Sequence, residues 1–328
     1  MLHVLSAFPS SMKTTSESGV NQVDLWIRSA TAKSVSGELY VGTSTEIALS
    51  ILPIVGQYAP DFWVRTLERV FSDFVDDEPT QLQISLTESQ RFGMSVGRLS
   101  VPFSSVESDD EIAQLCADSS YDLIIVRVSA DRAGILSSLQ GLVERSVLQA
   151  DTLEYFAWDL SNLPSESGES LDFETHASNQ FETIRSLVEV SFSGYRNHYS
   201  ENPQLARSAT VEGYLEWVER AMQAETSRMF LATKTGQLEP LGFIVADVNV
   251  QQHIAEVLLN GVDPAHRRQG VYQTCLIGAA RALRQIDGMT KLVISTQSAN
   301  TSVKAAWNQL GLRHWFDINT FHVMRTAT

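Results

Sequence analysis

The segment from Val257 to Leu283, VLLNGVDPAHRRQGVYQTCLIGAARAL, constrains the fold of this chain more than any other. An apolar run typical of a strand stops at Pro264, which cannot donate a ladder hydrogen bond, so strand pairing should end there. Beyond Gly270 the apolar residues resume at helical spacing. The pattern predicts a strand, a tight turn and a helix in direct succession.

The turn in this segment has the chemistry of an anion site. The first N–H groups of a helix lack intrahelical partners, and Gly270 lets the backbone approach a ligand closely. Arg267 and Arg268 bring positive charge to a helix start, where acidic side chains are normally favoured. We expect a nest for an anion such as a pyrophosphate. The alternative is an ordinary turn with solvated arginines.

Composition narrows the classes of partner. The chain has 328 residues, 43% of them hydrophobic, which is enough for a large core and predicts two domains. The 39 acidic residues outnumber the 24 basic ones, for a net charge of −15. This field repels phosphate backbones and anionic headgroups, so nucleic acid and membrane surfaces are not expected partners.

The two cysteines, Cys116 and Cys275, are too few for a disulfide framework and lack a metal-type spacing. The prediction is a protein without a metal, located in the cytoplasm. No apolar run approaches the roughly 20 residues that span a bilayer.

Composition shifts predict four segments. These are a Ser/Thr-rich flexible arm over residues 1–22, an α/β domain over 23–160, a Ser/Pro/Gly/Glu-rich linker over 161–174 and a second domain over 175–328.

In the first half, periodicity predicts a helix over Asp61–Val75 and two adjacent strands, QLQISL and MSVGRLSVP, joined by the polar piece TESQRFG. A helix starting at Ser108, a buried strand in YDLIIVRVSA, a further helix and the strand TLEYFAWDL follow.

The second half predicts two helices, a hairpin turning at Gly236, and then strand, helix, strand, helix and strand. The order is ααββ followed by βαβαβ.

The stretch VDPAHRRQGVY, residues 262–272, resembles the acyl-CoA motif V-x-P-x-x-Q/R-x-x-G-x-G/A of the GNAT superfamily of N-acetyltransferases. Val262, Pro264, Arg267 and Gly270 fit the motif, whereas Tyr272 replaces its final small residue. The element order and the segment KLVISTQSANTSVKAAWNQLGL extend the resemblance over residues 174–325. The fold it implies is a GNAT-like mixed α/β sheet flanked by helices.

The resemblance implies how acetyl-CoA, or another acyl-CoA, would bind as the donor substrate. The backbone of Gly261 and Val262 should pair with pantetheine where two strands splay apart, and Asn300 should contact pantetheine or the thioester. Backbone N–H groups should hold the pyrophosphate along the turn, from Arg267, Arg268, Gln269, Gly270, Val271 and Tyr272.

A second resemblance involves Phe92, Gly93 and Arg98, in RFGMSVGRL, and the TQ-to-Asn300 segment. They resemble two-domain enzymes of the dTDP-fucosamine acetyltransferase type, in which an incomplete GNAT-like domain precedes a complete one. The first half lacks the acyl-CoA motif, so it should not bind CoA. It should extend a continuous sheet or shape the acceptor cleft.

Acyl transfer to an amine needs a base and stabilisation of the departing thiolate. Glu256, six residues before Val262, is the first candidate base, and Asp247 is the second carboxylate. His198 and His322 are further candidates because histidine titrates near neutrality. The alternatives are an exposed strand carboxylate and a structurally satisfied histidine.

Many GNAT enzymes have a tyrosine that acts as the general acid seven residues after the asparagine that corresponds to Asn300. In this chain that position is Trp307. An indole N–H can donate a hydrogen bond but cannot release its proton at working pH. Tyr272 is expected at the pyrophosphate turn, and Cys275 lies one helical turn beyond it. The usual proton donor is therefore missing from its expected place.

The loop Gly194–Leu205 offers Tyr195, Asn197 and Tyr199 to a polar acceptor. A surface loop with capping side chains is the alternative. The resemblance implies an N-acetyltransferase acting on a small amine, such as an amino-sugar nucleotide or an amino-acid-like metabolite. A carrier-protein-bound acyl donor, a non-catalytic acyl-CoA-binding protein and a homodimer stay open.

Overall fold

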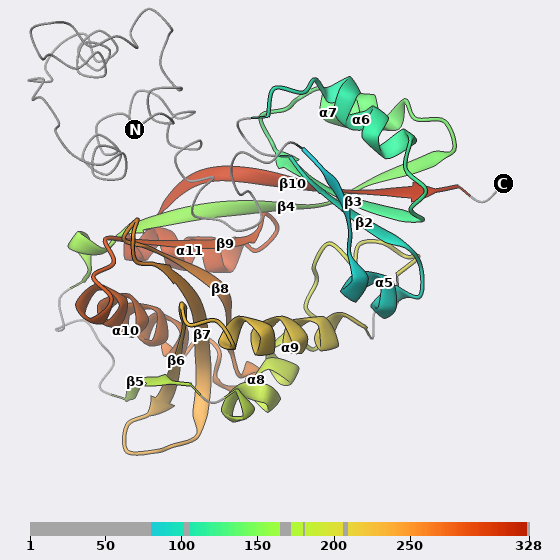
Figure 1. Ribbon diagram of the computed structural model, residues 1–328. Coiled ribbons are helices and arrows are strands. Elements are labelled where there is room, and N and C mark those ends of the chain that lie inside the picture. The colour runs from blue at the N-terminus through green and yellow to red at the C-terminus, as the bar shows by residue number, and fades with distance from the viewer. Residues whose placement is uncertain (1–79, 102–104, 165–171, 180, 206–208, 327–328) are drawn as a thin grey trace, which may run out of the picture. The chain divides into compact units, whose positions relative to one another are not determined.

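A single ten-stranded sheet organises the described part of the chain, with strand order β1-β2-β3-β10-β4-β9-β8-β7-β6-β5. The computed structural model describes residues 80–101, 105–164, 172–179, 181–205 and 209–326, all within one compact unit (Figure 1). The predicted arm 1–22 and the predicted helix Asp61–Val75 lie outside the described residues.

The strands, in sequence order, are β1 (Leu82–Ile84), β2 (Val96–Ser100), β3 (Leu123–Ser129), β4 (Arg145–Asp159), β5 (Phe173–Ser178), β6 (Ser227–Lys234), β7 (Pro240–Asn249), β8 (Ile254–Val262), β9 (Lys291–Gln297) and β10 (Arg313–Arg325). The helices are α5 (Leu86–Phe92), α6 (Asp109–Ala117), α7 (Ile135–Gln140), α8 (Glu182–Phe192), α9 (Ala209–Met222), α10 (Val271–Ile286) and α11 (Thr301–Leu310). Among the described residues, none of the helices combines the length and apolar character that a bilayer crossing needs.

The last strand, β10, joins the two halves of the sheet. It lies between β3 and β4 and runs antiparallel to both. Because β4 also pairs with β9, hydrogen bonding continues from the N-terminal strands into the C-terminal ones. Figure 1 shows β4 and β10 side by side as the two long strands of the sheet. The continuous sheet expected from the sequence is confirmed.

The C-terminal strands bury different residues on their two faces. One face, here called the α10 face, packs Ala255, Val257 and Ile294 with residues of α10 and with Trp307 of α11. The opposite face, here called the α8 face, packs Val245 and Leu259 against α8 and α9. In Figure 1, α10 lies on one side of β6 and β7, and α8 with α9 lies on the other.

Local signals place several elements as predicted. The Ser108 side chain accepts from Glu111 N while the Glu111 side chain accepts from Ser108 N, so a capping box starts α6. The β6–β7 hairpin turns at Gly236, which has a φ of 76°. Glycine adopts this positive φ without strain because it has no Cβ. Both sequence predictions are confirmed.

One expectation was wrong, and a tertiary contact explains it. The polar piece TESQRFG is not a plain connection but most of α5, which buries Glu88 against Arg98 and ends at Gly93 with φ 64°. The predicted linker 161–174 stays a prediction, because residues 165–171 lie outside the described residues. Its last two residues, Phe173 and Glu174, belong to β5, a polar edge strand that pairs with β6. Thr175 Oγ1 donates to Thr274 O in α10 at 3.1 Å. A polar strand of this kind lacks the apolar alternation that sequence patterns detect.

Candidate functional site

Strands β8 and β9 pair in parallel and then diverge. Their register runs from Ile254–Lys291 to Val257–Ile294. Beyond that pair, β9 stays with β4 as far as Gln297, and β8 stays with β7 as far as Val262. We call this separation of residues 258–262 from residues 295–297 the strand divergence. An unpaired strand edge presents N–H and C=O groups that can bind an extended ligand carrying amides.

A β-bulge at Leu258 sets which way the side chains of β8 point. Val257 pairs with Ala246 and Leu259 pairs with Val245, so Leu258 is an extra residue. Val257 therefore packs on the α10 face, whereas Leu259 packs on the α8 face. Glu256 precedes the bulge and alternates with Val257, which places it on the α8 face.

Glu256 and Asp247 are direct register partners across β8 and β7. Side chains in such antiparallel positions stand about 5 Å apart at their Cβ atoms. The two candidate carboxylates thus form one site. Because Val257 is the last residue of β8 paired with β9, this carboxylate pair lies at the start of the strand divergence.

The turn after β8 leaves the start of α10 open. Arg268 and Gly270 have φ of 61° and 90°, and a Cβ added at Gly270 would meet nothing within 4 Å. The first hydrogen bond into α10 runs from Thr274 N to Gly270 O at 3.0 Å, and Gly270 provides no side-chain cap. The amides of residues 271–273 therefore have no intrahelical acceptor and can bind an anion.

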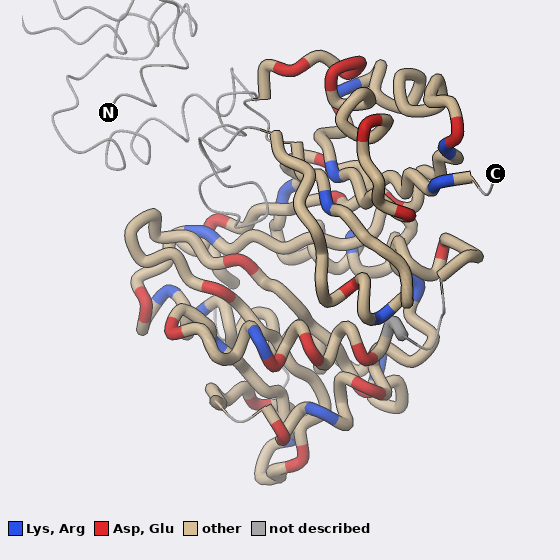
Figure 2. Tube along the Cα trace, turned by 45° about the vertical axis from the view of Figure 1, so that its right-hand side comes forward, with Lys and Arg blue, Asp and Glu red and all other residues tan. Residues whose placement is uncertain are grey.

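The two arginines of the turn have different environments. Arg267 folds back, with Nε 3.4 Å from Val262 O and Nη2 3.3 Å from Ser191 O, so it ties α8 to the end of β8. Arg268 is exposed. Gln269 donates from Nε2 to Ala265 O at 3.2 Å. Figure 2 shows basic and acidic residues interspersed over the described elements, so the positive charge of this turn is local.

Ser191 provides an unsatisfied polar atom beside the unpaired edge of β8. Its Oγ is buried and has no hydrogen-bond partner among the described residues. A Cβ added at Gly261 would stand 3.0 Å from that Oγ and 2.7 Å from Phe243 Cε1, so only glycine fits there. Buried hydroxyls are normally satisfied. The orphaned oxygen and the open strand edge together fit a ligand such as pantetheine.

Asn300 and Tyr195 meet at the end of β9. Asn300 donates from Nδ2 to Thr296 Oγ1 at 3.0 Å, and the Tyr195 hydroxyl bonds to Gln297 Oε1. Burial raises the pKa of Tyr195. The predicted Asn300 and Tyr195 are therefore brought together beside the strand divergence.

Tyr199 binds the N-terminal half of the chain. Its hydroxyl bonds to the Glu88 carboxylate, which also accepts from Arg98 Nε at 2.7 Å and Nη2 at 2.8 Å. Phe92 packs against the Tyr199 ring at 5.2 Å. Burial raises the pKa of Glu88, but the hydrogen bonds and charge of Arg98, together with the Tyr199 hydroxyl, outweigh it and lower the pKa to about 2. The residues of the N-terminal motif thus hold the predicted acceptor loop.

Asn197 is fully engaged within its loop. Its Nδ2 donates to the Tyr214 hydroxyl at 2.9 Å, and its Oδ1 accepts from Tyr199 N and Ser200 N at 3.0 and 3.1 Å. The side chain has 5% exposure. Its contacts are those of a capping residue.

His198 and His322 form a buried, neutral pair. Gln204 N donates to Asn202 Oδ1, which turns Asn202 Nδ2 toward His322 Nδ1 at 3.0 Å. His322 Nδ1 must accept, so His322 Nε2 carries the proton and donates to His198 Nδ1 at 2.9 Å. Burial lowers the pKa of His322 to about 4 and that of His198 well below its usual value. His322 is 0% exposed and both its ring nitrogens are engaged.

Asp151 is a titratable residue that sequence reasoning missed. It lies on β4, opposite Thr320 of β10, which in turn lies opposite Arg127 of β3. Burial raises the pKa of Asp151 to about 6, although the Arg127 charge and a Gln297 hydrogen bond act against the rise. The strand predicted from the sequence, TLEYFAWDL, begins one residue after Asp151, whereas β4 extends back to Arg145 and includes it.

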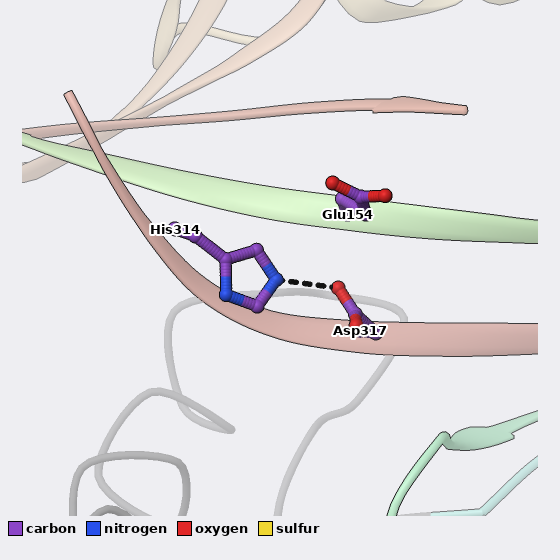
Figure 3. A group of neighbouring side chains, drawn as sticks. All are labelled: Glu154, His314 and Asp317. Carbon is purple, nitrogen blue, oxygen red and sulfur yellow. Dashed lines mark hydrogen bonds and ion pairs between the residues drawn. The ribbon is translucent and has the colours of Figure 1, made fainter. Parts of the chain in front are cut away.

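Glu154, His314 and Asp317 are the described residues with metal-type spacing (Figure 3). His314 Nε2 lies 2.6 Å from Asp317 Oδ1, and Figure 3 shows Glu154 on the neighbouring strand. Glu154 Oε1 also lies 2.6 Å from Lys304 Nζ. Because the ammonium of Lys304 already neutralises this carboxylate, the arrangement is that of a surface ion-pair network.

Comparisons with known proteins agree with this architecture. Residues 186–312, less than half of the chain, match the model of the acetyltransferase (GNAT) family. They include β8, the turn, α10 and α11. The predicted fold class is confirmed: a mixed sheet flanked by helices, with a GNAT domain in the C-terminal part. A search of curated protein sequences found no match.

Three solved structures illustrate the similarity. A conserved protein of unknown function from Staphylococcus epidermidis shares 9% identity at a TM-score of 0.49, covering 77% of this chain and 94% of that one. A GCN5-related N-acetyltransferase from Kribbella flavida shares 10% sequence identity at a TM-score of 0.46. The match covers 71% of this chain and 82% of that one. A tandem GNAT protein from the clavulanic acid biosynthesis pathway shares 11% sequence identity at a TM-score of 0.48. The match covers 71% of this chain and 76% of that one.

Proposed function

We propose that this chain is an acyl-CoA-dependent N-acyltransferase that transfers an acetyl or other acyl group to the amine of a small polar acceptor. The observation that carries the proposal is the unpaired edge of β8 leading directly to the uncapped start of α10. The edge matches the amides of pantetheine, and the helix start matches a pyrophosphate. The GNAT match over residues 186–312 supports acyl-CoA as the donor.

The helix α6 in the N-terminal half offers a useful contrast. Its start is closed by the Ser108–Glu111 capping box and carries Asp109 and Asp110 in the first turn. Acidic side chains there oppose binding of a phosphate. We therefore propose that the acyl-CoA site is at the start of α10, in the C-terminal part, and not at the start of α6.

For the chemistry, we assign Glu256 as the base that takes the proton of the acceptor amine, with Asp247 beside it. Glu256 lies on the α8 face at the start of the strand divergence, so an amine approaching from that face meets it next to the thioester. His198 and His322 are assigned a positioning role, because the His198 ring packs at a tilt against Tyr199, with centroids 3.8 Å apart, and bonds to His322.

The acceptor is proposed to be an amino-sugar nucleotide or an amino-acid-like metabolite in the cytoplasm. Tyr195 is the loop residue closest to the end of β9 through its bond to Gln297, so we propose that it contacts the acceptor.

Calorimetry with acetyl-CoA tests donor binding. Gly270→Glu should weaken binding at least tenfold, which corresponds to about 1.4 kcal/mol, because a carboxylate would occupy the anion nest. Gly236→Glu is a matched control, since both glycines have positive φ and open space around an added Cβ. Absence of binding to the unaltered protein would overturn the proposal.

Mass spectrometry of amines incubated with acetyl-CoA tests transfer. An acylated product supports the enzyme; binding without product across a broad panel favours a non-catalytic acyl-CoA-binding protein. A carrier-protein donor lacks the adenosine diphosphate of CoA. Arg268→Ala removes an exposed cation of the turn and should weaken acetyl-CoA binding if CoA is the donor.

A further inference from the structure

The two residues that depart from the GNAT pattern contact each other. Trp307 donates from Nε1 to the Tyr272 hydroxyl oxygen at 2.7 Å. An indole N–H can only donate, so the Tyr272 oxygen accepts this bond and its own O–H proton stays available for another acceptor. Trp307 is 0% exposed, which fixes the geometry of the pair, whereas Tyr272 is only partly buried.

The Trp307 ring packs near the start of the strand divergence. Trp307 packs edge-on against Phe156, with ring centroids 5.2 Å apart. Phe156 pairs with Ile294, and Ile294 is the last residue of β9 that pairs with β8. Because α10 follows β8 and α11 follows β9, a bond between Tyr272 and Trp307 crosses the strand divergence on the α10 face.

Glu256 stands at the same level on the opposite face. It neighbours Val257, the last residue of β8 that pairs with β9. A thioester lying in the divergence would then have a carboxylate on the α8 face and the Tyr272 hydroxyl on the α10 face. Acyl transfer requires a base for the attacking amine and a hydrogen-bond donor for the leaving sulfur, placed on opposite sides of the carbonyl.

Burial is the largest influence on the pKa of Tyr272 and raises it. The Trp307 hydrogen bond lowers this pKa, whereas the charges of Cys275 and Tyr195 raise it. Tyr272 thus keeps its proton at neutral pH.

We propose that Tyr272, positioned by Trp307, donates a hydrogen bond to the sulfur that leaves the acyl group. The inference rests on the proposed acyl-CoA function. The amine nitrogen bonds to the carbonyl carbon, the carbon–sulfur bond breaks, and its electron pair stays on sulfur, where the Tyr272 O–H stabilises it. The surplus proton of the amine passes to Glu256. Tyr272 is a catalytic residue in this step, and Trp307 is a positioning residue.

The test is the pKa of the thiol of bound CoA, measured from the ultraviolet absorbance of its thiolate during a pH titration. A donated hydrogen bond stabilises the thiolate, so Tyr272→Phe should raise this pKa by about one unit, a tenfold change in the ionisation constant. The protein's own thiols do not interfere, because burial raises the pKa of Cys116 and of Cys275 to about 12.

Two further variants keep the test decisive. Trp307→Phe should shift the thiol pKa in the same direction by a smaller amount, because Tyr272 keeps its hydroxyl but loses its orientation. Adding Trp307→Tyr to Tyr272→Phe should restore the lower value by returning a hydroxyl from α11. This readout needs no acceptor.

The outcomes separate the two proposals. If CoA binds the unaltered protein and its thiol titrates identically in Tyr272→Phe, the role of Tyr272 is overturned and the acyl-CoA function stands. If CoA does not bind the unaltered protein, the acyl-CoA function is overturned and this inference with it.

Discussion

The hydroxyl of Ser191 stands beside Gly261, 3.0 Å from where a Cβ of that glycine would lie, and has no hydrogen-bond partner among the described residues. Ser191 belongs to α8 and Gly261 to the unpaired edge of β8. Arg267 holds the two elements together through Ser191 O and Val262 O. This contact brings an unsatisfied oxygen to the place where the proposed donor would run.

Ser191→Ala should therefore change stability and binding in opposite directions. Removing a buried, unpaired hydroxyl should raise the free energy of unfolding of the unliganded protein by about 1 kcal/mol. The variant should bind acetyl-CoA several-fold more weakly, because a hydrogen bond to the ligand is lost. Urea denaturation and calorimetry measure the two effects.

Thr233→Val is the matched control for that variant, since Thr233 Oγ1 is also buried without a described partner but lies on β6. It should stabilise the protein and leave acetyl-CoA binding unchanged. Equal affinity in Ser191→Ala and the unaltered protein would contradict the assignment of Ser191.

The Glu88–Arg98 pair should make stability depend on pH between about 2 and 4.5. The pKa of Glu88 in the folded protein, about 2, lies below its ordinary value of 4.5. The stabilisation is therefore complete above pH 4.5 and is lost as pH falls toward 2. Glu88→Gln should lower the free energy of unfolding at pH 7 by about 2 kcal/mol and flatten this part of the curve.

Urea denaturation across this pH range checks the Glu88 prediction. Glu182→Gln, which removes the exposed partner of Arg185, serves as the control and should leave the curve unchanged. A Glu88→Gln curve parallel to that of the unaltered protein would show that the pair does not act through ionisation.

Asp151 should change the pH dependence of stability in the direction opposite to Glu88, because it destabilises the folded protein as pH rises. Its pKa of about 6 lies above the ordinary value of 3.8, so folding favours its protonated form. Its unfavourable contribution is absent below pH 3.8 and complete once pH has risen through 6. Asp151→Asn should raise the free energy of unfolding at pH 7 by about 1 kcal/mol, after allowance for partial exposure. No change at pH 7 between variant and unaltered protein would contradict this prediction.

Glu256→Gln should separate catalysis from donor binding. Loss of a general base lowers turnover by about a hundredfold or more. Acetyl-CoA affinity should stay the same, because the amide keeps the shape of the carboxylate. Asp247→Asn should reduce turnover less, since Asp247 lies on β7, one strand further from β9 than Glu256. The measurement is acyl transfer to an amine identified in the panel. Similar turnover in Glu256→Gln and the unaltered protein would remove Glu256 from the mechanism.

Patterns confined to neighbouring residues were predictable. Ser108 with Glu111 specified the start of α6, and Pro264 with Gly270 specified the strand, turn and helix from β8 to α10. Capping and turn geometry depend on groups a few residues apart, so they can be read along the chain.

Features that depend on distant partners were not predictable in the same way. The face of Glu256 depends on a bulge at Leu258, which the pairing with β7 defines. The sequence shows that Trp307 stands where a tyrosine is usual, but its hydrogen bond to Tyr272 on another helix depends on how α10 and α11 pack.

The sequence by itself determined the strand, turn and helix from β8 to α10, because proline, glycine and a helix start act on their own backbone. The tertiary structure decided that β10 would join two half-sheets, that Tyr199 would bind Glu88, and that Tyr272 would lie against Trp307. Such contacts form between residues far apart in the chain, where register and burial, and not local preference, decide which side chains meet.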